Sequence, residues 1–334
     1  MSQPLKLEKK LRVMSGTRTT HHLHVGNYFG AIKNWVSLQD QYQCFFGVMD
    51  YHGLTTAYKN SFEIQSYNRD IFADLLAWGV DPEISTIFIQ SQVPEHLELF
   101  MHFMNLTPMG WLERVPTWKD AEAESRATDT HNLGRFSYPV LQAADIAIYF
   151  GHLVPVGADQ VAHLELTREI IRRFNHLYKG NLPEPKHLLT EVPLLPGLDG
   201  RKMSKSYGNT LLLTEDEKTL KKKVNSMLTD SRRALRENPG VPEDCTVFQF
   251  HKLYSTLEEK AWVIEGCTTA KIGCGDCKAK LCANIEEKTK IPREKKKELL
   301  NKPSHLDSIM AAGCEKARKE ASKNISIIRD WMKF

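Results

Sequence analysis

The stretch LRVMSGTRTTHHLHVGNYFGAIKNWV at residues 11–36 decides the fold of this chain. Leu11–Met14 is a short apolar strand candidate, and Ser15–Thr17 is typical of a turn. Tyr28–Tyr42 then spaces its large apolar side chains as an amphipathic helix does. The pair Gly26-Asn27 therefore falls at a strand–turn–helix junction, where free backbone N–H groups and the helix dipole favour an anion. Because glycine has no Cβ, a nucleotide can approach the backbone there closely.

The first two thirds of the chain alternate short apolar runs with amphipathic stretches. Further strand candidates are Cys44–Met49, Thr86–Ile89 and Leu153–Val156, and the helix-like segments between them include Ser61–Trp78 and Ala162–Tyr178. Such alternation predicts an α/β fold: a Rossmann-like parallel sheet covered by helices, with ligands at the carboxyl ends of the strands.

A change in character near residue 208 predicts a second domain. At 334 residues the chain is long for one hydrophobic core. From about Thr214 the strand signals fade, and charge-rich helical stretches continue to Ile328. We therefore expect a sheet-containing domain at 1–208 and an all-α domain at 209–334.

Composition is ordinary for a soluble globular protein, with 41% hydrophobic and 26% charged residues. No apolar run reaches the length of a membrane span, and the amino terminus lacks the apolar region of a signal peptide, so we expect a cytoplasmic protein without a membrane partner. A net charge of +4 is too small to indicate nucleic-acid binding. Three basic runs in the second half are solvated helix faces or, less commonly, an RNA-facing patch: Lys221–Lys223, Arg232–Arg233 and Lys295–Lys297.

The pentapeptide Lys202-Met203-Ser204-Lys205-Ser206 follows the turn-forming stretch Pro196–Gly200. A mobile loop of this kind can carry two ammonium groups onto a polyphosphate, and a plain solvated basic loop is the alternative. Far upstream, His24 is a neutral donor candidate for a phosphate in transfer. His21, His22 and His24 could instead form a metal site, but no matching ligands stand nearby, so His21 and His22 are more simply surface residues.

The segment His24-Val25-Gly26-Asn27 followed by Lys202–Ser206 resembles the paired signatures of class I aminoacyl-tRNA synthetases. Further segments resemble the tryptophanyl-tRNA synthetase family, and this resemblance covers most of the chain. It implies an enzyme that activates L-tryptophan with ATP to tryptophanyl-adenylate and transfers it to tRNA(Trp), releasing pyrophosphate and AMP. The matching segments are Gly26–Ala31 with Trp35, Asp50–His52, Phe88–Pro94, Leu112–Arg114, Val154–Gln160, His163, Leu166–Arg168 and Thr229–Ser231.

The stretch Tyr138–Asp145 carries the implied tryptophan selectivity. Asp145 matches the carboxylate that accepts the indole N–H, and indole has one donor and no acceptor, so an apolar slot with one buried acceptor selects it. For the apolar positions of the slot, ordinary core packing is the alternative. The other implied tryptophan-binding residues are Tyr138, Gln142 and Gln160 around the ammonium and carboxylate, Met14, Met49, Val154 and Val156 as walls, and His52 closing the slot.

The resemblance also implies the nucleotide site. Lys202 and Lys205, with Mg²⁺, would neutralise the leaving pyrophosphate, while His24 and Asn27 would hold the ATP phosphates. These four residues are the catalytic candidates. The remaining implied ATP-binding residues are Arg18, Thr19, Thr20, Gly26, Gly157, Ala158, Asp159, Leu194, Met203, Ser204 and Ser206.

Departures from the family pattern leave alternatives open. The family often has Pro and Gly where this chain has Thr19 and His21, so the turn before His24 can be shaped differently, and many bacterial members carry Met where Gln142 stands. The Tyr–Gln–Asp trio also resembles tyrosyl-tRNA synthetases, although no tyrosine in Arg12–Gly16 could serve as a second partner for the phenol. A regulatory paralogue that does not charge tRNA is the non-enzyme alternative, but it would be expected to lose the lysines or the Gly–Asn site. The family resemblance further implies a homodimer in which each tRNA touches both subunits.

Seven cysteines in a cytosolic chain indicate thiols or metal ligands rather than disulfides. Four of them follow the spacing C-x21-C-x6-C-x2-C, which suits four thiolates on Zn²⁺ or on a [4Fe–4S] cluster, and four unrelated buried thiols are the alternative. The pattern resembles that of a subset of tryptophanyl-tRNA synthetases with a [4Fe–4S] cluster beside the anticodon-binding surface. That resemblance implies a structural cluster in an anticodon-binding domain at 209–334, with Cys282 as the rival fourth ligand. The four cysteines are Cys245, Cys267, Cys274 and Cys277.

Overall fold

A computed structural model describes residues 10–116, 118–119, 131–157, 160–189, 195–204 and 207–334. The chain divides into two compact units. The first comprises Met1–His22, Ala31–Glu191 and Lys302–Phe334, and the second comprises Leu23–Gly30 and Val192–Asn301. This division differs from a single cut after residue 208, because one short early segment groups with the second unit and the last helix groups with the first. Within the described residues, no helix combines the length and apolarity that a membrane span needs.

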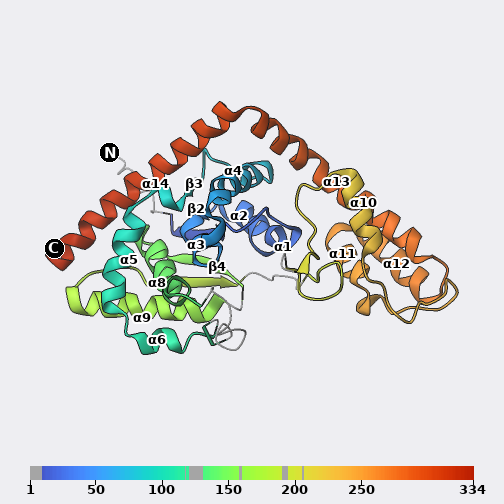
Figure 1. The fold of residues 1–334 in the computed structure, drawn as a ribbon, viewed down its shortest axis with the longest axis horizontal. Coiled ribbons are helices and arrows are strands. Elements are labelled where there is room, and N and C mark those ends of the chain that lie inside the picture. Colours follow the sequence, from blue (N-terminus) through green and yellow to red (C-terminus); the bar gives the residue numbers. More distant parts are fainter. Residues whose placement is uncertain (1–9, 117, 120–130, 158–159, 190–194, 205–206) are drawn as a thin grey trace, which may run out of the picture. The chain divides into compact units, whose positions relative to one another are not determined.

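The first unit is built on a five-stranded parallel sheet with the order β3-β2-β1-β4-β5 (Figure 1). The predicted Rossmann-like sheet is confirmed, and all four predicted strands form. The fifth strand was not predicted, because it is a short edge strand that begins with two exposed polar residues and so gives little apolar signal. The strands are β1 (Arg12–Arg18), β2 (Gln43–Met49), β3 (Thr86–Ile89), β4 (Leu153–Val156) and β5 (Lys186–Leu189).

The turn expected at Ser15–Thr17 is wrong, because these residues belong to β1. They pair in parallel register with Phe46, Gly47 and Val48 of β2. Gly16 serves close packing here rather than a turn, since a Cβ at that position would come within 2.6 Å of the Met49 side chain. Pairing with a neighbouring strand, which a local sequence window cannot report, decides the conformation.

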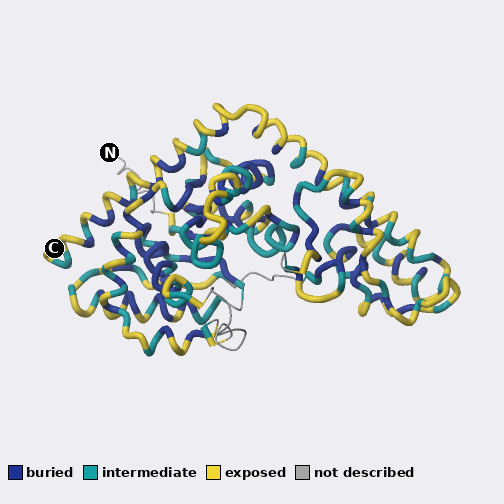
Figure 2. Tube along the Cα trace, viewed as in Figure 1, coloured by how far each residue is buried: buried dark blue, intermediate teal, exposed yellow. Residues whose placement is uncertain are grey.

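Helices surround the sheet, and the side chains between them form the core (Figures 1 and 2). Large aromatic residues fill it: Trp35 is fully buried and stacks on Phe46 at 4.7 Å between ring centroids, and Phe88 and Phe103 are also fully buried. The helical elements of this unit are α2 (Lys33–Leu38), α3 (Asp50–Ala57), η2 (Tyr58–Asn60), α4 (Ser61–Ala77), η3 (Gln90–Gln92), α5 (Glu95–Leu106), α6 (Met109–Glu113), α8 (Leu133–Ile148), α9 (Val161–Tyr178) and α14 (Pro303–Met332).

The helix α14 belongs to the first unit because it covers the open edge of the sheet at β3. The backbone N–H of Ile89 donates to Sγ of Cys314 at 3.3 Å, and Gly313 brings the helix backbone against the carbonyl oxygen of Ile87. Ion pairs add to this attachment, including Arg329 with Glu98 of α5 at 2.6 Å. Covering an edge strand removes a template for pairing with other chains.

The second unit is helical over most of its length, as the sequence predicts. Its helices begin at identifiable caps: Asp216 accepts from the N–H of Thr219 at 2.9 Å, and Thr256 forms a capping box with Glu259. The helix predicted at Tyr28–Tyr42 is interrupted, since its first five residues form a π-helical turn. The elements are α1 (Val25–Asn27), the start of η1 (Tyr28–Ile32), α10 (Glu217–Ser226), η6 (Pro242–Asp244), α11 (Thr246–Tyr254), α12 (Leu257–Thr268) and α13 (Cys274–Asn301).

We expect Gly313→Ala to destabilise the protein. The new Cβ would lie 2.0 Å from the carbonyl oxygen of Ile87, so α14 must move away from β3, at a cost of about 1–3 kcal/mol in the free energy of unfolding. The matched control is Gly110→Ala on α6, whose Cβ would meet only the Glu113 side chain at 3.9 Å. Urea unfolding should show a lower midpoint for Gly313→Ala alone. An unchanged midpoint would mean that α14 does not press on β3 as described.

Candidate functional site

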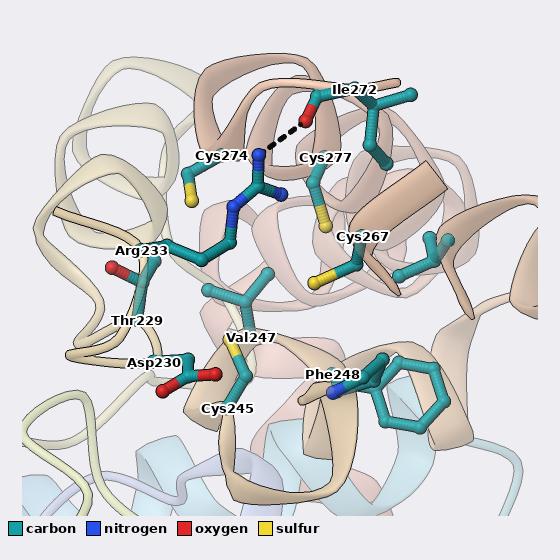
Figure 3. Close-up of a pocket in the computed structure, with 12 residues that line it drawn as sticks. Thr229, Asp230, Arg233, Cys245, Val247, Phe248, Cys267, Ile272, Cys274 and Cys277 are labelled. Atoms are coloured by element: carbon teal, nitrogen blue, oxygen red, sulfur yellow. Dashed lines mark hydrogen bonds between the residues drawn. The ribbon is translucent and has the colours of Figure 1, made fainter. Parts of the chain in front are cut away.

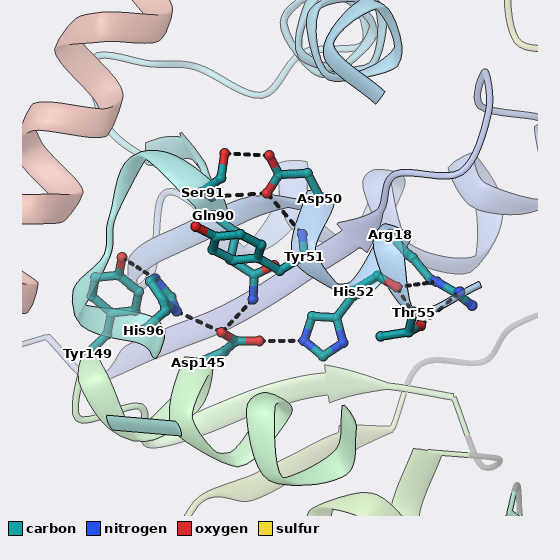
Figure 4. Close-up of polar contacts among 10 residues, drawn as sticks. All are labelled: Arg18, Asp50, Tyr51, His52, Thr55, Gln90, Ser91, His96, Asp145 and Tyr149. Atoms are coloured by element: carbon teal, nitrogen blue, oxygen red, sulfur yellow. Dashed lines mark hydrogen bonds and ion pairs between the residues drawn. The ribbon is translucent and has the colours of Figure 1, made fainter. Parts of the chain in front are cut away.

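Asp145 lies on α8, is 2% exposed, and sits among three hydrogen-bond donors (Figure 4). Its Oδ1 accepts from Nε2 of Gln90 at 2.8 Å and from Nδ1 of His96 at 2.7 Å. Its Oδ2 accepts from Nε2 of His52 at 2.7 Å. The structure thus joins two of the predicted tryptophan-binding residues, Asp145 and His52, directly to each other.

The environment of Asp145 keeps its carboxyl group ionised. Burial by itself would raise the pKa of Asp145, but the hydrogen bonds from His52 and His96 outweigh burial and hold the pKa well below its usual range. An ionised carboxylate accepts at about four lone-pair positions, and the described residues occupy three. The fourth, on Oδ2, can accept one further N–H.

The donors to Asp145 come from segments that follow parallel strands, which is where such sheets bind ligands. His52 lies in the first turn of α3, directly after β2, and Gln90 begins η3, directly after β3. Asp50 holds these two segments together, because its carboxylate accepts from the backbone N–H of Ser91 at 2.9 Å and from its hydroxyl. Asn68 of α4 donates to the same carboxylate at 2.9 Å.

Two more predicted residues meet through a histidine. The Tyr138 hydroxyl lies 2.8 Å from Nε2 of His163, and Nδ1 of His163 lies 2.8 Å from Oε1 of Gln160. His163 is fully buried, and the sequence analysis assigns it no role of its own. His163 therefore fixes the orientation of both the Tyr138 and the Gln160 side chain.

The predicted slot walls are all buried residues of the sheet: Met14, Met49, Val154 and Val156. Gln142 is half-buried on α8. Both a slot wall and an ordinary core residue are buried, so the role of these residues in binding stays a prediction.

Arg18, at the end of β1, holds the turn that carries His52. Its Nε donates to the His52 carbonyl at 2.9 Å, and its guanidinium also donates to the hydroxyls of Thr55 and Thr56. Burial, opposed by Tyr138, lowers the pKa of Arg18, which remains a cation because the ordinary pKa of arginine is so high.

The turn after β1 is shaped by Thr19, where the family often has proline. The N–H of Thr19 donates to the Met49 carbonyl at 3.3 Å, a bond that proline could not make. Gly53 allows the close approach, since a Cβ there would lie 2.0 Å from the Thr19 carbonyl oxygen. Thr20 is half-buried beside this turn. Gly157, which follows β4, is half-buried too, and its carbonyl accepts from the N–H of Gln160 at 3.0 Å.

In the second unit the two signature segments meet. The N–H of Val25 donates to the Leu211 carbonyl at 2.9 Å, and the N–H of Leu213 donates to the Leu23 carbonyl at 3.0 Å. A Cβ on Gly26 would lie 3.8 Å from Sδ of Met203. The early histidine–glycine segment is therefore bound to the strand-like segment that follows the lysine loop.

The expectation of free backbone N–H groups at this junction is wrong for two residues. The N–H of Val25 is used as above, and the N–H of Asn27 donates to the His24 carbonyl at 2.8 Å. Oδ1 of Asn27 in turn accepts from the His24 N–H at 2.9 Å. α1 is only three residues long, and the amide of Asn27 serves this local turn while that of Val25 serves the bond to Leu211.

Asn209 organises the lysine loop, a role that no sequence pattern predicts. Its Oδ1 accepts from the N–H of Ser204 at 2.8 Å, and its Nδ2 donates to Asp199 at 2.7 Å and to the Lys202 carbonyl at 3.2 Å. Asn209 is buried, whereas Lys202 is exposed. The predicted residues Ala158, Asp159, Leu194, Lys205 and Ser206 lie outside the described residues.

The four spaced cysteines line one cavity of the second unit, together with Arg233 (Figure 3). Burial, reinforced by the charges of the other three, raises the pKa of Cys277 to about 12. Among the described residues, no three His, Cys, Asp or Glu side chains converge closely enough to bind a single metal ion, and all seven cysteines are free thiols. Cys282 is not among the residues that line the cavity. The cavity-lining cysteines are Cys245, Cys267, Cys274 and Cys277.

The basic runs are less solvated than the sequence suggests. Lys223 pairs with Glu215, Arg233 donates to the Ile272 carbonyl at 2.8 Å, and Lys296 is 5% exposed. Each run nevertheless keeps exposed members, such as Lys221 and Lys222.

Of the site residues that the sequence analysis did not predict, His96 could have been found from its position on an apolar helix face. With Leu99 and Phe103 it occupies positions i, i+3 and i+7 of one buried helix face. A histidine on such a face needs a polar partner, which here is Asp145. Tyr149, His163 and Asn209 left no comparable signal.

Comparisons with known proteins agree with this geometry. The family described as tRNA synthetases class I (W and Y) matches residues 6–289. The tryptophan–tRNA ligase of Thermotoga maritima is 47% identical over 321 residues, and that of Ralstonia nicotianae is 40% identical over 391; each alignment covers 96% of this chain and 98% of the relative. The crystal structure of tryptophanyl-tRNA synthetase from Campylobacter jejuni complexed with ADP and tryptophan has a TM-score of 0.88 at 37% identity, covering 97% of this chain and 100% of that one.

We expect Asn209→Ala to loosen the lysine loop. Three hydrogen bonds are lost, so the amide hydrogen of Ser204 should exchange with solvent about ten times faster, which corresponds to roughly 1–1.5 kcal/mol of local stability. As a control, Asn238→Ala removes the similar bond to the N–H of Leu235 at 2.8 Å and should leave Ser204 unaffected. Unchanged exchange at Ser204 in Asn209→Ala would contradict the organising role.

Proposed function

Because this chain belongs to the class I tRNA synthetases for tryptophan and tyrosine, we propose that it is a tryptophan–tRNA ligase. It activates L-tryptophan with ATP and transfers the tryptophanyl group to tRNA(Trp). Full-length similarity to tryptophan–tRNA ligases, rather than to a fragment of them, supports this assignment.

The observation that carries the choice of amino acid is the ionised Asp145 with one acceptor position left. An indole N–H is a donor only, so it matches an acceptor-only group in an apolar setting. A phenol both donates and accepts, and it would be better served by a site with a second donor. The buried methionines and valines of the sheet, which the resemblance places in the slot, suit the apolar body of indole.

Adenylate formation needs positioning and charge stabilisation more than covalent chemistry from the protein. A carboxylate oxygen of tryptophan attacks the α-phosphorus of ATP, the bond to the bridging oxygen breaks, and pyrophosphate leaves with that electron pair. A ribose hydroxyl at the 3′ end of the tRNA then attacks the carbonyl carbon, and AMP leaves. Groups that are fixed before the reaction and that favour the developing charge lower both barriers.

We assign the phosphates to the paired signature segments. The exposed ammonium group of Lys202 and its loop partner Lys205 would neutralise the leaving pyrophosphate, with His24 and Asn27 as further phosphate contacts. Mg²⁺ accompanies ATP as its phosphate complex. Further nucleotide contacts are assigned to Arg18, Thr19, Thr20, Gly26, Gly157, Ala158, Asp159, Leu194, Met203, Ser204 and Ser206.

We further propose that the four-cysteine cavity holds a [4Fe–4S] cluster. Burial and then the charges of the neighbouring cysteines raise the pKa of Cys267 and of Cys277, and a bound cation would offset both effects by favouring the thiolates. Four cysteines that line one cavity suit either Zn²⁺ or a [4Fe–4S] cluster. The resemblance of their sequence pattern to that of cluster-bearing tryptophanyl-tRNA synthetases favours the iron–sulfur group.

The cluster would be held by Cys245, Cys267, Cys274 and Cys277 and would act as a structural brace. These cysteines lie at the start of α11, near the end of α12 and in the first turn of α13, so one group would fix three helices. We propose that this helical region, within 209–334, recognises the anticodon through exposed basic residues such as Lys221 and Lys222. We also propose a cytoplasmic homodimer in which each tRNA contacts both subunits.

The exchange of labelled pyrophosphate into ATP tests the proposed reaction. We expect wild-type exchange to depend on tryptophan and to be negligible with tyrosine. Asp145→Ala should lower kcat/KM for tryptophan at least about a hundredfold, since it removes the acceptor and leaves buried donors unpaired. The control Asp307→Ala removes a half-exposed carboxylate of α14 and should leave exchange unchanged. Faster exchange with tyrosine than with tryptophan would reject the assignment.

Iron content tests the cluster. Protein purified without oxygen should be brown and contain four irons per chain, and Cys274→Ser should bleach it and weaken tRNA charging more than pyrophosphate exchange. The control Cys282→Ser should keep its colour, because Cys282 does not line the cavity. Colourless wild-type protein with one zinc per chain would reject the iron–sulfur cluster but keep the four ligands.

A further inference from the structure

Behind Asp145 lies a buried pair of side chains to which the proposed reaction assigns no role. His96 of α5 contacts Oδ1 of Asp145 through Nδ1 at 2.7 Å, and its Nε2 lies 2.9 Å from the Tyr149 hydroxyl (Figure 4). His96 and Tyr149 are both fully buried. The three residues form a chain that runs from the aromatic core to the carboxylate.

The direction of the protons in this chain follows from its two ends. The ionised Asp145 only accepts, so Nδ1 of His96 carries the hydrogen. Burial, with the charge of Asp145, raises the pKa of Tyr149 well above its usual range, so the phenol keeps its proton. In the described part of the chain the Tyr149 hydroxyl has one hydrogen-bond partner, Nε2 of His96. This assigns the tautomer: Tyr149 donates to His96, and His96 donates to Asp145.

Packing fixes the rings that make these bonds. Tyr149 stacks on Phe45 at 4.4 Å with 17° between the planes, and His96 lies over Phe88 at 5.5 Å with 26°. Neither ring can turn without disturbing the core, because protein interiors are densely packed. Oδ1 of Asp145 is therefore saturated by His96 and Gln90, while Oδ2 has only His52.

We propose that His96 and Tyr149 are positioning residues for indole recognition, which keep Oδ1 of Asp145 occupied so that Oδ2 alone accepts the indole N–H. This inference rests on the proposed function. Tyr149 acts through His96: its hydroxyl donates to Nε2 and so stabilises the tautomer with the hydrogen on Nδ1, which can donate to Asp145. Without it, Nε2 of His96 loses its donor in a buried site, and the imidazole is free to change tautomer. Oδ1 then becomes a rival acceptor, and selection of the indole N–H weakens.

The substitution Tyr149→Phe removes only the hydroxyl, and a substrate analogue tells positioning from packing. In 3-benzothienylalanine a sulfur replaces the indole N–H, so this analogue makes no hydrogen bond to Asp145. Pyrophosphate exchange should show kcat/KM for tryptophan falling about five- to tenfold, in line with one lost buried hydrogen bond. The value for the analogue should change less than about twofold, and KM for ATP should not change.

The matched control is Tyr254→Phe in the second unit. Tyr254 is buried like Tyr149, but in the described residues its hydroxyl has no hydrogen-bond partner. Both substrates should behave with this variant as with the wild type. His96→Gln is the second probe, because a glutamine amide can still donate to Asp145 but does not reproduce the fixed imidazole; it should also lower kcat/KM for tryptophan selectively.

The possible results distinguish a positioning role from a purely structural one. Equal losses for tryptophan and the analogue in both variants would show a purely structural role and overturn the inference, as would no loss at all. If Tyr149→Phe does not fold, shown by its thermal unfolding curve, His96→Gln decides the question by the same ratio. Wild-type protein that fails to activate tryptophan would reject the proposed function itself, and this inference with it.

Discussion

The structure of the first unit depends on how one buried negative charge is neutralised. An unpaired ionised carboxylate inside a protein is costly, so Asp145 requires donors that are already in place. They come from α3, which follows β2, and from the stretch of η3 and α5, which follows β3, so two parts of the chain that are distant in sequence meet at the carboxyl ends of these strands. Two residues that do not contact Asp145 hold these segments in place. Asp50 accepts a hydrogen bond from the Ser91 N–H, and Arg18 donates one to the His52 carbonyl. The site is thus as fixed as the sheet that carries it.

The two units divide the chemistry between them. The first holds the acceptor network and the buried apolar residues suited to an aromatic amino acid, while the second holds both signature segments and the four-cysteine cavity. Backbone hydrogen bonds of Leu23 and Val25 with Leu211 and Leu213 bind the first signature segment to the stretch that follows the lysine loop, although these residues are far apart in sequence. Lys202 is exposed, whereas Asn209, which holds the lysine loop, is buried, so the proposed contact of this lysine with a phosphate would not disturb the fold.

Sequence reasoning reached the sheet, four of its five strands, the helical second part and the family, because apolar periodicity and motif order are local properties. It failed where contacts between residues distant in sequence determine the local structure. Ser15–Thr17 looks like a turn until β2 pairs with it, and β5 is an edge strand with exposed polar residues. The return of α14 to the first unit depends on Gly313 fitting against Ile87, a contact without a local signature. At the site, Asp145 was predicted from a motif, whereas Tyr149 and Asn209 act only through contacts that the folded chain creates.

The central claim is that Oδ2 of the ionised Asp145 receives the indole N–H while Oδ1 stays bound to Gln90 and His96. A crystal structure of the protein with tryptophan tests it most directly. We predict an indole nitrogen about 2.7–3.2 Å from Oδ2, with the contact from His96 to Oδ1 and the contact from Tyr149 to His96 both retained. An indole nitrogen that bonds another acceptor, or that takes the place of His96 on Oδ1, would contradict the account.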